Sequence, residues 1–291
     1  MGELNLLVGA LAVGGVYSLI ALGFSMIIRS TGILHFAQGD VMMMGAMAGL
    51  TTVILVPLPL PVLLIVGMIV AGMIGVVIEL LIYRNLRNRG VPLMNIITAT
   101  LGISILLVNI ARLVWGAEPM RYPQLFSSAS YQFGSLLIAP QLFWIFVLSL
   151  ALMVLLQLFL KHTRTGIAMQ AAAQDPEAAE IMGINLTRTR AYTFGIGGAL
   201  AGAAGVMLGS MFFAYFEMGF ITGIKGFVAA TLGGLGSIGG AMAGGLLFGL
   251  IETYGAVFIS SAYKDAIGMV LLILILLVFP SGLAGIWRRR R

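Results

Sequence analysis

Residues 161–190 read KHTRTGIAMQAAAQDPEAAEIMGINLTRTR, and they form the one long polar interval in a chain that is otherwise almost entirely apolar. Three of the ten acidic residues of the chain stand within six positions of this interval, and basic residues bracket both of its ends. A segment with so many charges cannot lie in hydrocarbon, because each charge would lose its hydration. The interval therefore connects two membrane spans outside the bilayer.

Within this interval, the residues around Asp175 predict the start of a helix. Asp175 suits the N-cap position and Pro176 suits the first helical position. Glu177 and Glu180 then lie near the positive end of the helix dipole. Gly183 fits the cap at the other end. We therefore expect a short acidic helix outside the bilayer.

The composition of the whole chain is that of a polytopic membrane protein. Of its 291 residues, 60% are hydrophobic and 9% are charged, and the mean hydropathy is +1.09. The apolar runs are long and do not alternate, which excludes a porin-type barrel. The chain has no cysteine, which excludes disulfides and thiolate metal sites.

We predict an all-α bundle that forms a single transmembrane domain over residues 1–291. A span needs about 20 residues, and the N-terminal segment lacks the features of a signal peptide, so we interpret it as the first span. About eight spans are expected, at 5–28, 33–56, 59–83, 93–116, 138–160, 188–213, 238–258 and 263–286.

The positive-inside rule orients these spans. Three basic clusters define the cytoplasmic side and place the N-terminus outside and the C-terminus inside. They are Arg84, Arg87 and Arg89; Lys161, Arg164, Arg188 and Arg190; and Arg288, Arg289, Arg290 and Arg291. Residues 161–190 are then a cytoplasmic loop. Lys225 and Lys264 are among the few bases off that side.

The parity of the spans requires one more passage through the membrane between residues 213 and 238. The available chain, residues 220–237, is short and rich in glycine, so we predict a half-helix that ends at a break near Gly233 and Gly234. Backbone that is not helical at membrane depth survives where protein or a water-filled cavity covers it, and broken helices line transport pathways. The predicted path residues of this break are Gly233, Gly234, Gly236 and Gly239.

Of the acidic residues inside predicted spans, we single out Asp40, Glu79 and Glu252 as candidates for function. With Arg29 nearby, we expect Asp40 to form an ion pair between helices or between subunits, and we expect Glu252 to pair with Lys264. For Glu79, we expect a structural role through a contact with nearby Tyr83 or Arg84, or by snorkelling.

Polar residues of the fourth span are further candidates for lining a path. Asn95, Thr98 and Gly102 share one helical face. The alternative is that such side chains bond to the preceding turn or to a neighbouring helix. No metal-ligand spacing, catalytic constellation or P-loop is present, so we predict no metal site, no cofactor and no enzymatic activity for this chain.

Three stretches together resemble the permease subunit of the high-affinity branched-chain amino acid ABC importers. They are TRTGIAMQAAAQDPEAAEIMGIN (163–185), GIKGFVAATLGGLGSIGGAMAGGLLFGLIE (223–252) and GGVYSLIALGFSMIIRSTGILHFAQGDVMMMGA (14–46). The resemblance implies a bacterial-type inner membrane, two partner ATPases that hydrolyse ATP, a second and different permease chain, and an extracytoplasmic solute-binding protein. Membrane lipid is the remaining expected partner, and no nucleic acid partner is expected.

In that resemblance, residues 161–190 are the loop that couples the ATPases to the spans. Small residues and acids give this loop a surface suited to a groove with a basic rim, and the expected contacts are Ala171, Ala172, Gln174, Asp175, Pro176, Glu177, Ala179 and Gly183. The alternative is a connecting helix that lies on the lipid headgroups.

The function predicted from these features is transport of branched-chain or related amino acids into the cytoplasm by alternating access. Urea, short amides and aromatic acids remain open as substrates. A self-contained channel or an ion-coupled carrier is the alternative, and it requires internal symmetry and a deep ion site.

Overall fold

The computed structural model describes residues 2–123, 125–126, 131–133, 136–258, 260–278 and 282. In this part of the chain, seven helical segments are long and apolar enough to cross a membrane. They are α1 (Gly2–Thr31), α2 (Gln38–Leu55), α3 (Leu60–Val77) with its continuation, α5 (Leu93–Trp115), α6 (Pro140–His162), α9 (Leu186–Met211) and α11 (Ile238–Phe258). The predicted all-α membrane bundle is therefore confirmed.

Shorter elements complete the described structure. A π-helical turn η1 (Ile78–Tyr83) and α4 (Arg84–Asn88) continue α3 into one long span. The others are a hairpin of β1 (Tyr131–Phe133) and β2 (Leu136–Ile138), then α7 (Arg164–Gln174), α8 (Pro176–Ile181), α10 (Met218–Gly233), the 3₁₀ turn η2 (Ser261–Tyr263) and α12 (Lys264–Val278).

The ends of two predicted spans call for comment. The eighth was expected over residues 263–286, and α12 is described over 15 of them, from Lys264 to Val278. Most of the remaining residues of that prediction lie outside the described chain. The second span begins at Gln38 rather than at residue 33, because Gly32 (φ +71°) ends α1 and residues 33–35 have no regular structure.

Glycine lets the central helices of the bundle pack at backbone distance. α9 packs on α1, α2 and α3, and α1 packs along α11. A Cβ atom added at Gly202 would lie 2.3 Å from the carbonyl oxygen of Gly67, and one added at Gly205 would lie 2.1 Å from that of Met42. These positions admit no larger residue without displacing a helix, as expected for small residues at membrane helix interfaces.

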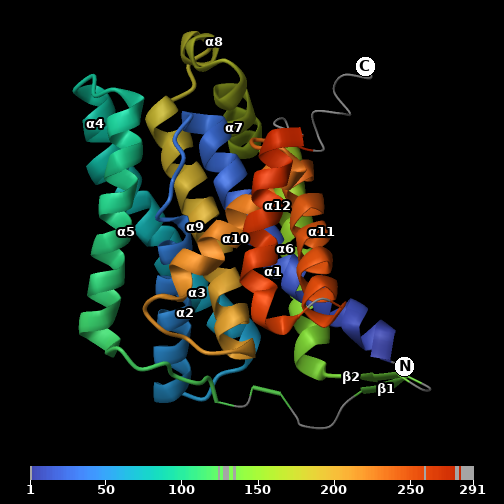
Figure 1. Ribbon diagram of the computed structural model, residues 1–291. Helices are drawn as coiled ribbons and strands as arrows, with labels where there is room; N and C mark the ends of the chain where they lie inside the picture. Colours follow the sequence, from blue (N-terminus) through green and yellow to red (C-terminus); the bar gives the residue numbers. More distant parts are fainter. Residues whose placement is uncertain are drawn as a thin grey trace.

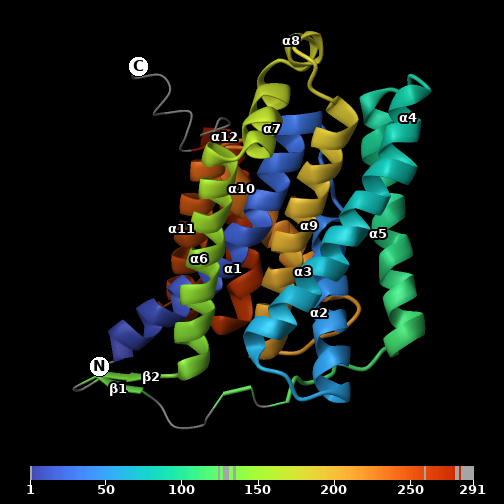
Figure 2. The same cartoon turned by 180° about the vertical axis from the view of Figure 1, so that it is seen from behind.

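Two helices, α2 and α10, begin inside the bundle rather than at its ends (Figure 1 and Figure 2). Residues 32–37 lead from the end of α1 back to Gln38, whose side-chain amide donates to the carbonyl of Gly197 in the middle of α9 (2.9 Å). Residues 212–217 lead in the same way from α9 to α10. The first turns of α2 and α10 meet there, where a Cβ at Gly39 would lie 2.1 Å from the carbonyl oxygen of Gly219.

The predicted half-helix and its glycine break are confirmed. α10 ends at Gly233, and α11 starts five residues later at Ile238. Gly234 (φ +102°) and Gly236 (φ +81°) adopt conformations that L side chains rarely reach. The sequence therefore located both the break and the residues that make it possible.

The segments predicted to share the cytoplasmic side do lie at one end of the molecule. Figures 1 and 2 show α4, α7 and α8 together at that end, with the N-terminal end of α1 and the β1–β2 hairpin at the other. The basic residues of α4 and those flanking α7 and α9 therefore gather on one side of the bundle. Arg288 to Arg291 lie outside the described residues.

Candidate functional site

The helix predicted at Asp175 is present as α8, and its caps are those expected. The Asp175 carboxylate accepts a hydrogen bond from the backbone N–H of Ala178 (3.0 Å), and Pro176 is the first helical residue. Gly183 (φ +83°) ends the helix, and Ile184 N–H donates to the carbonyl of Ala179 (2.9 Å). The structure adds a second helix, α7, which the sequence analysis did not separate from the loop.

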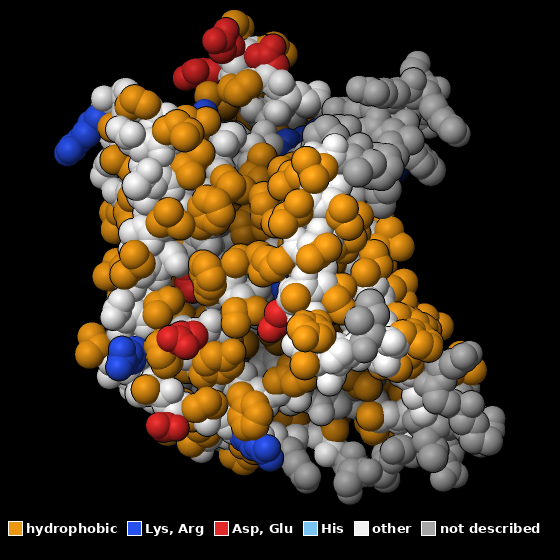
Figure 3. All heavy atoms as spheres, in the orientation of Figure 1, with side chains coloured by type: hydrophobic (Ala, Val, Ile, Leu, Met, Phe, Trp, Pro, Cys, Tyr) orange, Lys and Arg blue, Asp and Glu red, His pale blue; other side chains and the backbone are white. Residues whose placement is uncertain are grey.

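The tip of the molecule, which we define as residues 174–183, combines acids with exposed apolar side chains. Asp175, Glu177 and Glu180 are exposed and project from the end of the molecule around α8 (Figure 3). Next to them, Ile181 is 86% exposed and Met182 is 80% exposed. None of the three acids belongs to an ion pair among the described residues. This surface can bind a partner with a basic rim and an apolar centre.

The structure places the other predicted contact residues on two sides of the loop. Gln174, Pro176 and Gly183 are exposed and belong to the tip. Ala172 and Ala179, however, are 4% exposed and face the rest of the protein, and Ala171 is half-buried. The exposed face of the tip is therefore formed by the acids, Ile181 and Met182 rather than by Ala172 and Ala179.

Helix α7 joins the tip to three spans. It packs on α6, α1 and α9, and its Gln170 side chain donates to the carbonyl of Leu160 at the end of α6 (2.5 Å). A Cβ atom at Gly166 would lie 2.3 Å from the Phe159 carbonyl oxygen, so α7 sits directly against the end of α6. The tip is therefore connected through α7 to α1, α6 and α9.

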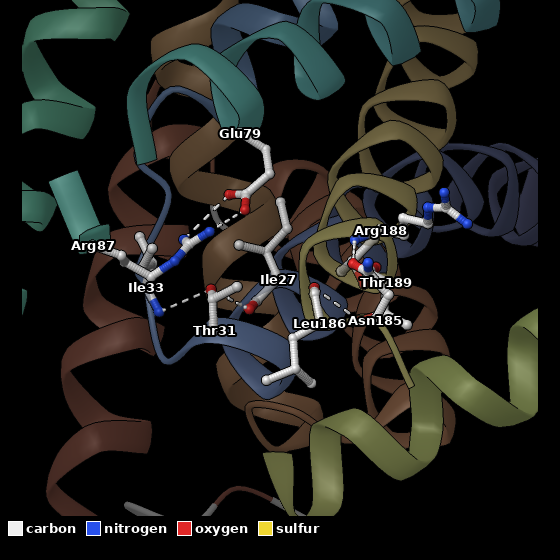
Figure 4. A network of polar contacts seen from close by, with 10 residues as sticks. Ile27, Thr31, Ile33, Glu79, Arg87, Asn185, Leu186, Arg188 and Thr189 are labelled. Carbon is white, nitrogen blue, oxygen red and sulfur yellow. Dashed lines mark hydrogen bonds and ion pairs between the residues drawn. The ribbon is translucent and has the colours of Figure 1, made fainter. Parts of the chain in front are cut away.

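The Glu79 carboxylate is fully buried and pairs with Arg87, whose guanidinium donates to both of its oxygens (Figure 4). We expected contacts with Tyr83 or Arg84, and this prediction was wrong. In a π-helical turn each residue rotates the chain about the helix axis by a smaller angle than in an α-helix. This change brings Arg87 to the same face of the helix as Glu79. Tyr83 instead bonds His35 through Nδ1 (2.8 Å).

The Glu252 carboxylate lies in a four-helix ionic cluster, which we define as Tyr17, Lys225, Glu252 and Asp265. Lys225 Nζ lies 2.5 Å from Glu252 Oε1 and 2.7 Å from Asp265 Oδ1, and Tyr17 donates to Glu252 Oε2 (2.7 Å). The predicted partner was Lys264, and this was wrong. Lys264 lies over the ring of Phe212, 5.8 Å from its centroid.

The Asp40 carboxylate has no ion pair with Arg29 among the described residues, so the predicted pair within the chain was wrong, and the alternative of a pair between subunits stays a prediction. Asp40 is 1% exposed, and neither of its oxygens has a hydrogen-bond partner among the described residues. The reason is positional: Arg29 lies near the end of α1 beside Gly236, whereas Asp40 follows the segment that leads back into the bundle. This group is the least satisfied charge in the described structure.

The predicted path residues lie in two separate places. Asn95 and Thr98 are exposed on α5, on the side opposite its buried residues Ile96, Ile103 and Leu107. Helix α5 stands at one edge of the bundle and packs on α2 (Figures 1 and 2). The glycines of the break lie instead between α10 and α11.

Within the break itself, the predicted glycines have different surroundings. Gly233 packs directly on Gly240, because a Cβ there would lie 1.9 Å from the Gly240 carbonyl oxygen. Gly239 has open space around the position of a Cβ, and Gly234 and Gly236 supply the turn. The structure therefore gives Gly233 a packing role and leaves Gly239 free to face a path.

The sequence analysis missed Lys225, Asp265 and Tyr17 as partners of Glu252. One observation pointed to Lys225: it is the one basic residue within the apolar half-helix 220–237. A lysine at membrane depth needs a carboxylate. In the described residues, no group of three His, Cys, Asp or Glu side chains is arranged to hold a metal ion.

Comparison with known proteins shows which family and which relatives this chain is similar to. Residues 6–277 match the family described as branched-chain amino acid transport system / permease component. The chain is 38% identical to the high-affinity branched-chain amino acid transport system permease protein BraD of Pseudomonas aeruginosa, over 97% of this chain and 95% of that protein.

Two further relatives come from other organisms. The chain is 35% identical to the corresponding permease protein LivH of Escherichia coli (94% of this chain, 92% of that protein). It is 32% identical to the probable permease protein LivH of Methanocaldococcus jannaschii (99% and 95%). No solved structure matches the chain.

Proposed function

Because the chain belongs to the family of branched-chain amino acid transport system permease components, we propose that it is the membrane subunit of an ATP-driven importer. Its cargo is a branched-chain amino acid or a related small polar solute, and the chain does not itself hydrolyse ATP. The observation that carries this proposal is the tip: three carboxylates with no ion-pair partner among the described residues, and two exposed apolar side chains, all outside the spans.

The tip is the surface on which an ATPase subunit docks. A soluble domain with a basic rim pairs with Asp175, Glu177 and Glu180, and an apolar pocket takes Ile181 and Met182, which water otherwise surrounds. Burial of these two side chains favours binding by about 1.5–3 kcal/mol each. Two ATPases serve two permease subunits, and both bind at the end that carries α4, α7 and α8.

Coupling follows from the packing of α7. When the ATPases close on ATP, the tip moves, and α7 passes this movement to the ends of α1, α6 and α9. These three spans respond first to the movement of the tip, because α7 packs directly on them. Packed interfaces move between discrete arrangements rather than deforming continuously, so the spans shift as units. The passage between the two permease subunits then changes the side of the membrane to which it opens, and residues 161–190 act as the coupling loop.

A second permease subunit, which the resemblance implies to be a different chain, covers the outer face of α5. Asn95, Thr98 and Asn109 follow this face, and membrane helices place such polar groups toward protein or water. Thr98 and Asn109 bond the carbonyls of Met94 and Ile105 in their own helix, so they offer only weak contacts to a passing zwitterion. We therefore place the translocation path beside α5, at the boundary with the second permease.

The chain is a multi-pass membrane protein, and we place it in a bacterial-type inner membrane. The end that carries α8 faces the cytoplasm, since the basic residues of α4 and those around α7 gather there. The opposite end, with the β1–β2 hairpin, receives an extracytoplasmic solute-binding protein that delivers the substrate.

Reconstitution into vesicles tests the proposal. The chain alone is expected to move no labelled leucine, whereas the chain with its partner permease, ATPases and binding protein is expected to accumulate leucine only when ATP is supplied. Uptake by the chain alone would establish a channel or carrier instead. Uptake by the complete assembly without ATP would equally contradict an ATP-driven importer.

A further inference from the structure

Asp40 is a buried carboxylate that the coupling mechanism does not use. It is 1% exposed, and within the part of the chain that the structure describes both of its oxygens lack a hydrogen-bond partner. The hydroxyl of Ser104 on α5 lies next to it without a hydrogen bond of good geometry. An uncompensated carboxylate in a membrane bundle costs several kcal/mol, and such groups in native proteins call for an explanation.

The carboxylate lies where the starts of two helices meet. Asp40 is in the first turn of α2, and its Oδ1 would lie 2.7 Å from a Cβ atom built at Gly219, in the first turn of α10. Both helices begin inside the bundle (Figures 1 and 2). Helix α10 has no side-chain cap, because Glu217 at its N-cap position makes no capping hydrogen bond.

This arrangement places opposite charges side by side. The first N–H groups of a helix carry a partial positive charge of roughly half an elementary charge, and they bind anions readily. The Asp40 carboxylate supplies a full negative charge within the same few ångströms. A zwitterion with an ammonium and a carboxylate on one carbon has the complementary pattern.

We propose that Asp40 and the first turn of α10 form the site that recognises the backbone of the transported amino acid in mid-membrane. The Asp40 carboxylate binds the substrate ammonium, and the backbone N–H groups near Gly219 bind the substrate carboxylate. The side chain of the substrate points away from this junction, so the site is specific for amino acids as a class rather than for one of them. This inference rests on the proposed function of the chain as an amino acid permease.

The site is closed in this structure, and its construction allows it to open. The contact between α2 and α10 is made by glycine against backbone. Gly39 contacts Gly219, and a Cβ atom built at Gly223 would lie 3.0 Å from the Cα atom of Gly39. At these glycines no side chain lies between the two backbones. The two helices can therefore separate with little rearrangement, and the space between them then lies against Asp40.

The absence of cysteine from the chain gives a direct test. A single Ser104→Cys substitution places a thiol next to Asp40, in the complete importer purified in detergent. The thiol is labelled with a cationic or an anionic methanethiosulfonate reagent while ATP is turned over. With Asp40 present, we expect the cationic reagent to react about tenfold faster than the anionic one, since a nearby charge concentrates ions of opposite sign. Asp40→Asn should abolish this preference, and Asp40→Glu should keep it.

Protection by ligands tests recognition of the ammonium group. L-Leucine should slow the labelling of Ser104→Cys several-fold, whereas 4-methylpentanoate, which has the same carbon skeleton and carboxylate without the ammonium, should not. In the Asp40→Asn variant, leucine should lose its effect. A cysteine at Glu118, an exposed position in the loop after α5, serves as the control whose labelling does not depend on Asp40.

Each of the other outcomes overturns the inference. A thiol at position 104 that never reacts shows that the junction stays shut, and equal rates for both reagents show that Asp40 carries no charge toward the opening. If leucine and 4-methylpentanoate slow the labelling equally, the site does not recognise the ammonium group. Uptake of leucine by the unmodified importer is measured in parallel, and its absence would count against the proposed function instead.

Discussion

The tip and the ionic cluster hold the same kind of side chain in opposite conditions. At the tip, Glu177 and Glu180 are exposed at the end of the molecule and have no ion-pair partner among the described residues. In the ionic cluster, Glu252 is 0% exposed and contacts both Lys225 and Tyr17. Water satisfies the first carboxylates, and protein alone must satisfy the second.

This difference indicates which acids are available to bind a partner and which acids stabilise the fold. A charge that water already solvates contributes little to folding, so it is available to a partner. A charge inside the bundle has lost its hydration, so the removal of its counter-charge leaves it uncompensated. Substitutions in the ionic cluster should therefore act on the fold, and substitutions at the tip should act on assembly and transport.

The largest effect on stability is expected for Lys225→Met. The substitution leaves Glu252 buried without its cation and should lower the free energy of unfolding by about 3–5 kcal/mol. Thermal unfolding in detergent measures this change. The matched control is Lys264→Met: Lys264 contacts only the ring of Phe212 among the described interactions, and its loss should cost about 0.5–1 kcal/mol. If the two substitutions lowered the free energy of unfolding equally, the ionic cluster would not stabilise the fold more than an isolated lysine does.

A smaller loss is expected for Arg87→Met. Glu79 is fully buried, but the Arg87 side chain is 20% exposed, so water can reach the vacated position. We expect a loss of about 1–3 kcal/mol. Arg84→Met, at an exposed neighbour in the same short helix, should change the unfolding temperature little. A loss for Arg84→Met as large as that for Arg87→Met would show that general charge, not the pair with Glu79, stabilises this region.

A substitution at the base of the tip should have an intermediate effect. Asp175→Ala removes the N-cap of α8 and its bond to the Ala178 N–H, which should cost about 1 kcal/mol. Because the loss frays the helix that presents the tip, binding of the ATPase subunit should also weaken. Asp175→Ser keeps a capping oxygen and should restore most of the helix but not the charge. Comparison of ATPase binding by the two variants therefore separates the cap from the carboxylate.

The smallest effect on stability and a large effect on function are expected at the tip itself. Glu177→Gln combined with Glu180→Gln should shift the free energy of unfolding by less than about 0.5 kcal/mol. Leucine uptake and co-purification of the ATPases should fall strongly, because the partner loses its charge complement. Glu118→Gln, an exposed acid in the loop after α5, is the control and should leave uptake unchanged. Normal uptake by the double variant would contradict docking at the tip.

Much of the architecture followed from local patterns. Asp175, Pro176 and Gly183 predicted α8 and both of its caps, because capping depends on residues within one helical turn. The glycine break after Gly233 was also predicted, since the parity of the spans left only a short, glycine-rich segment for one passage through the membrane. These features depend on neighbouring residues or on the length of the bilayer.

The partners of the buried acids were not predicted. Glu252 and Lys225 are 27 residues apart and Glu252 and Tyr17 are 235 apart, so no sequence pattern of one helix joins them. Glu79 was assigned a neighbour in sequence, but an unforeseen π-helical turn moved Arg87 into its place. The burial of Ala172 and Ala179 was missed for a similar reason, because the composition of a loop does not show which face packs on the spans.

The sequence by itself determined that the chain crosses a membrane repeatedly, where its polar loop lies and where a helix must break. Hydropathy, capping and glycine conformation are local properties, and the thickness of the bilayer turns them into an architecture. The tertiary structure alone decided which charges meet and that α2 and α10 begin face to face at Asp40. Such contacts join residues far apart in the chain, and they are selected by the packing of whole helices, which no single segment encodes.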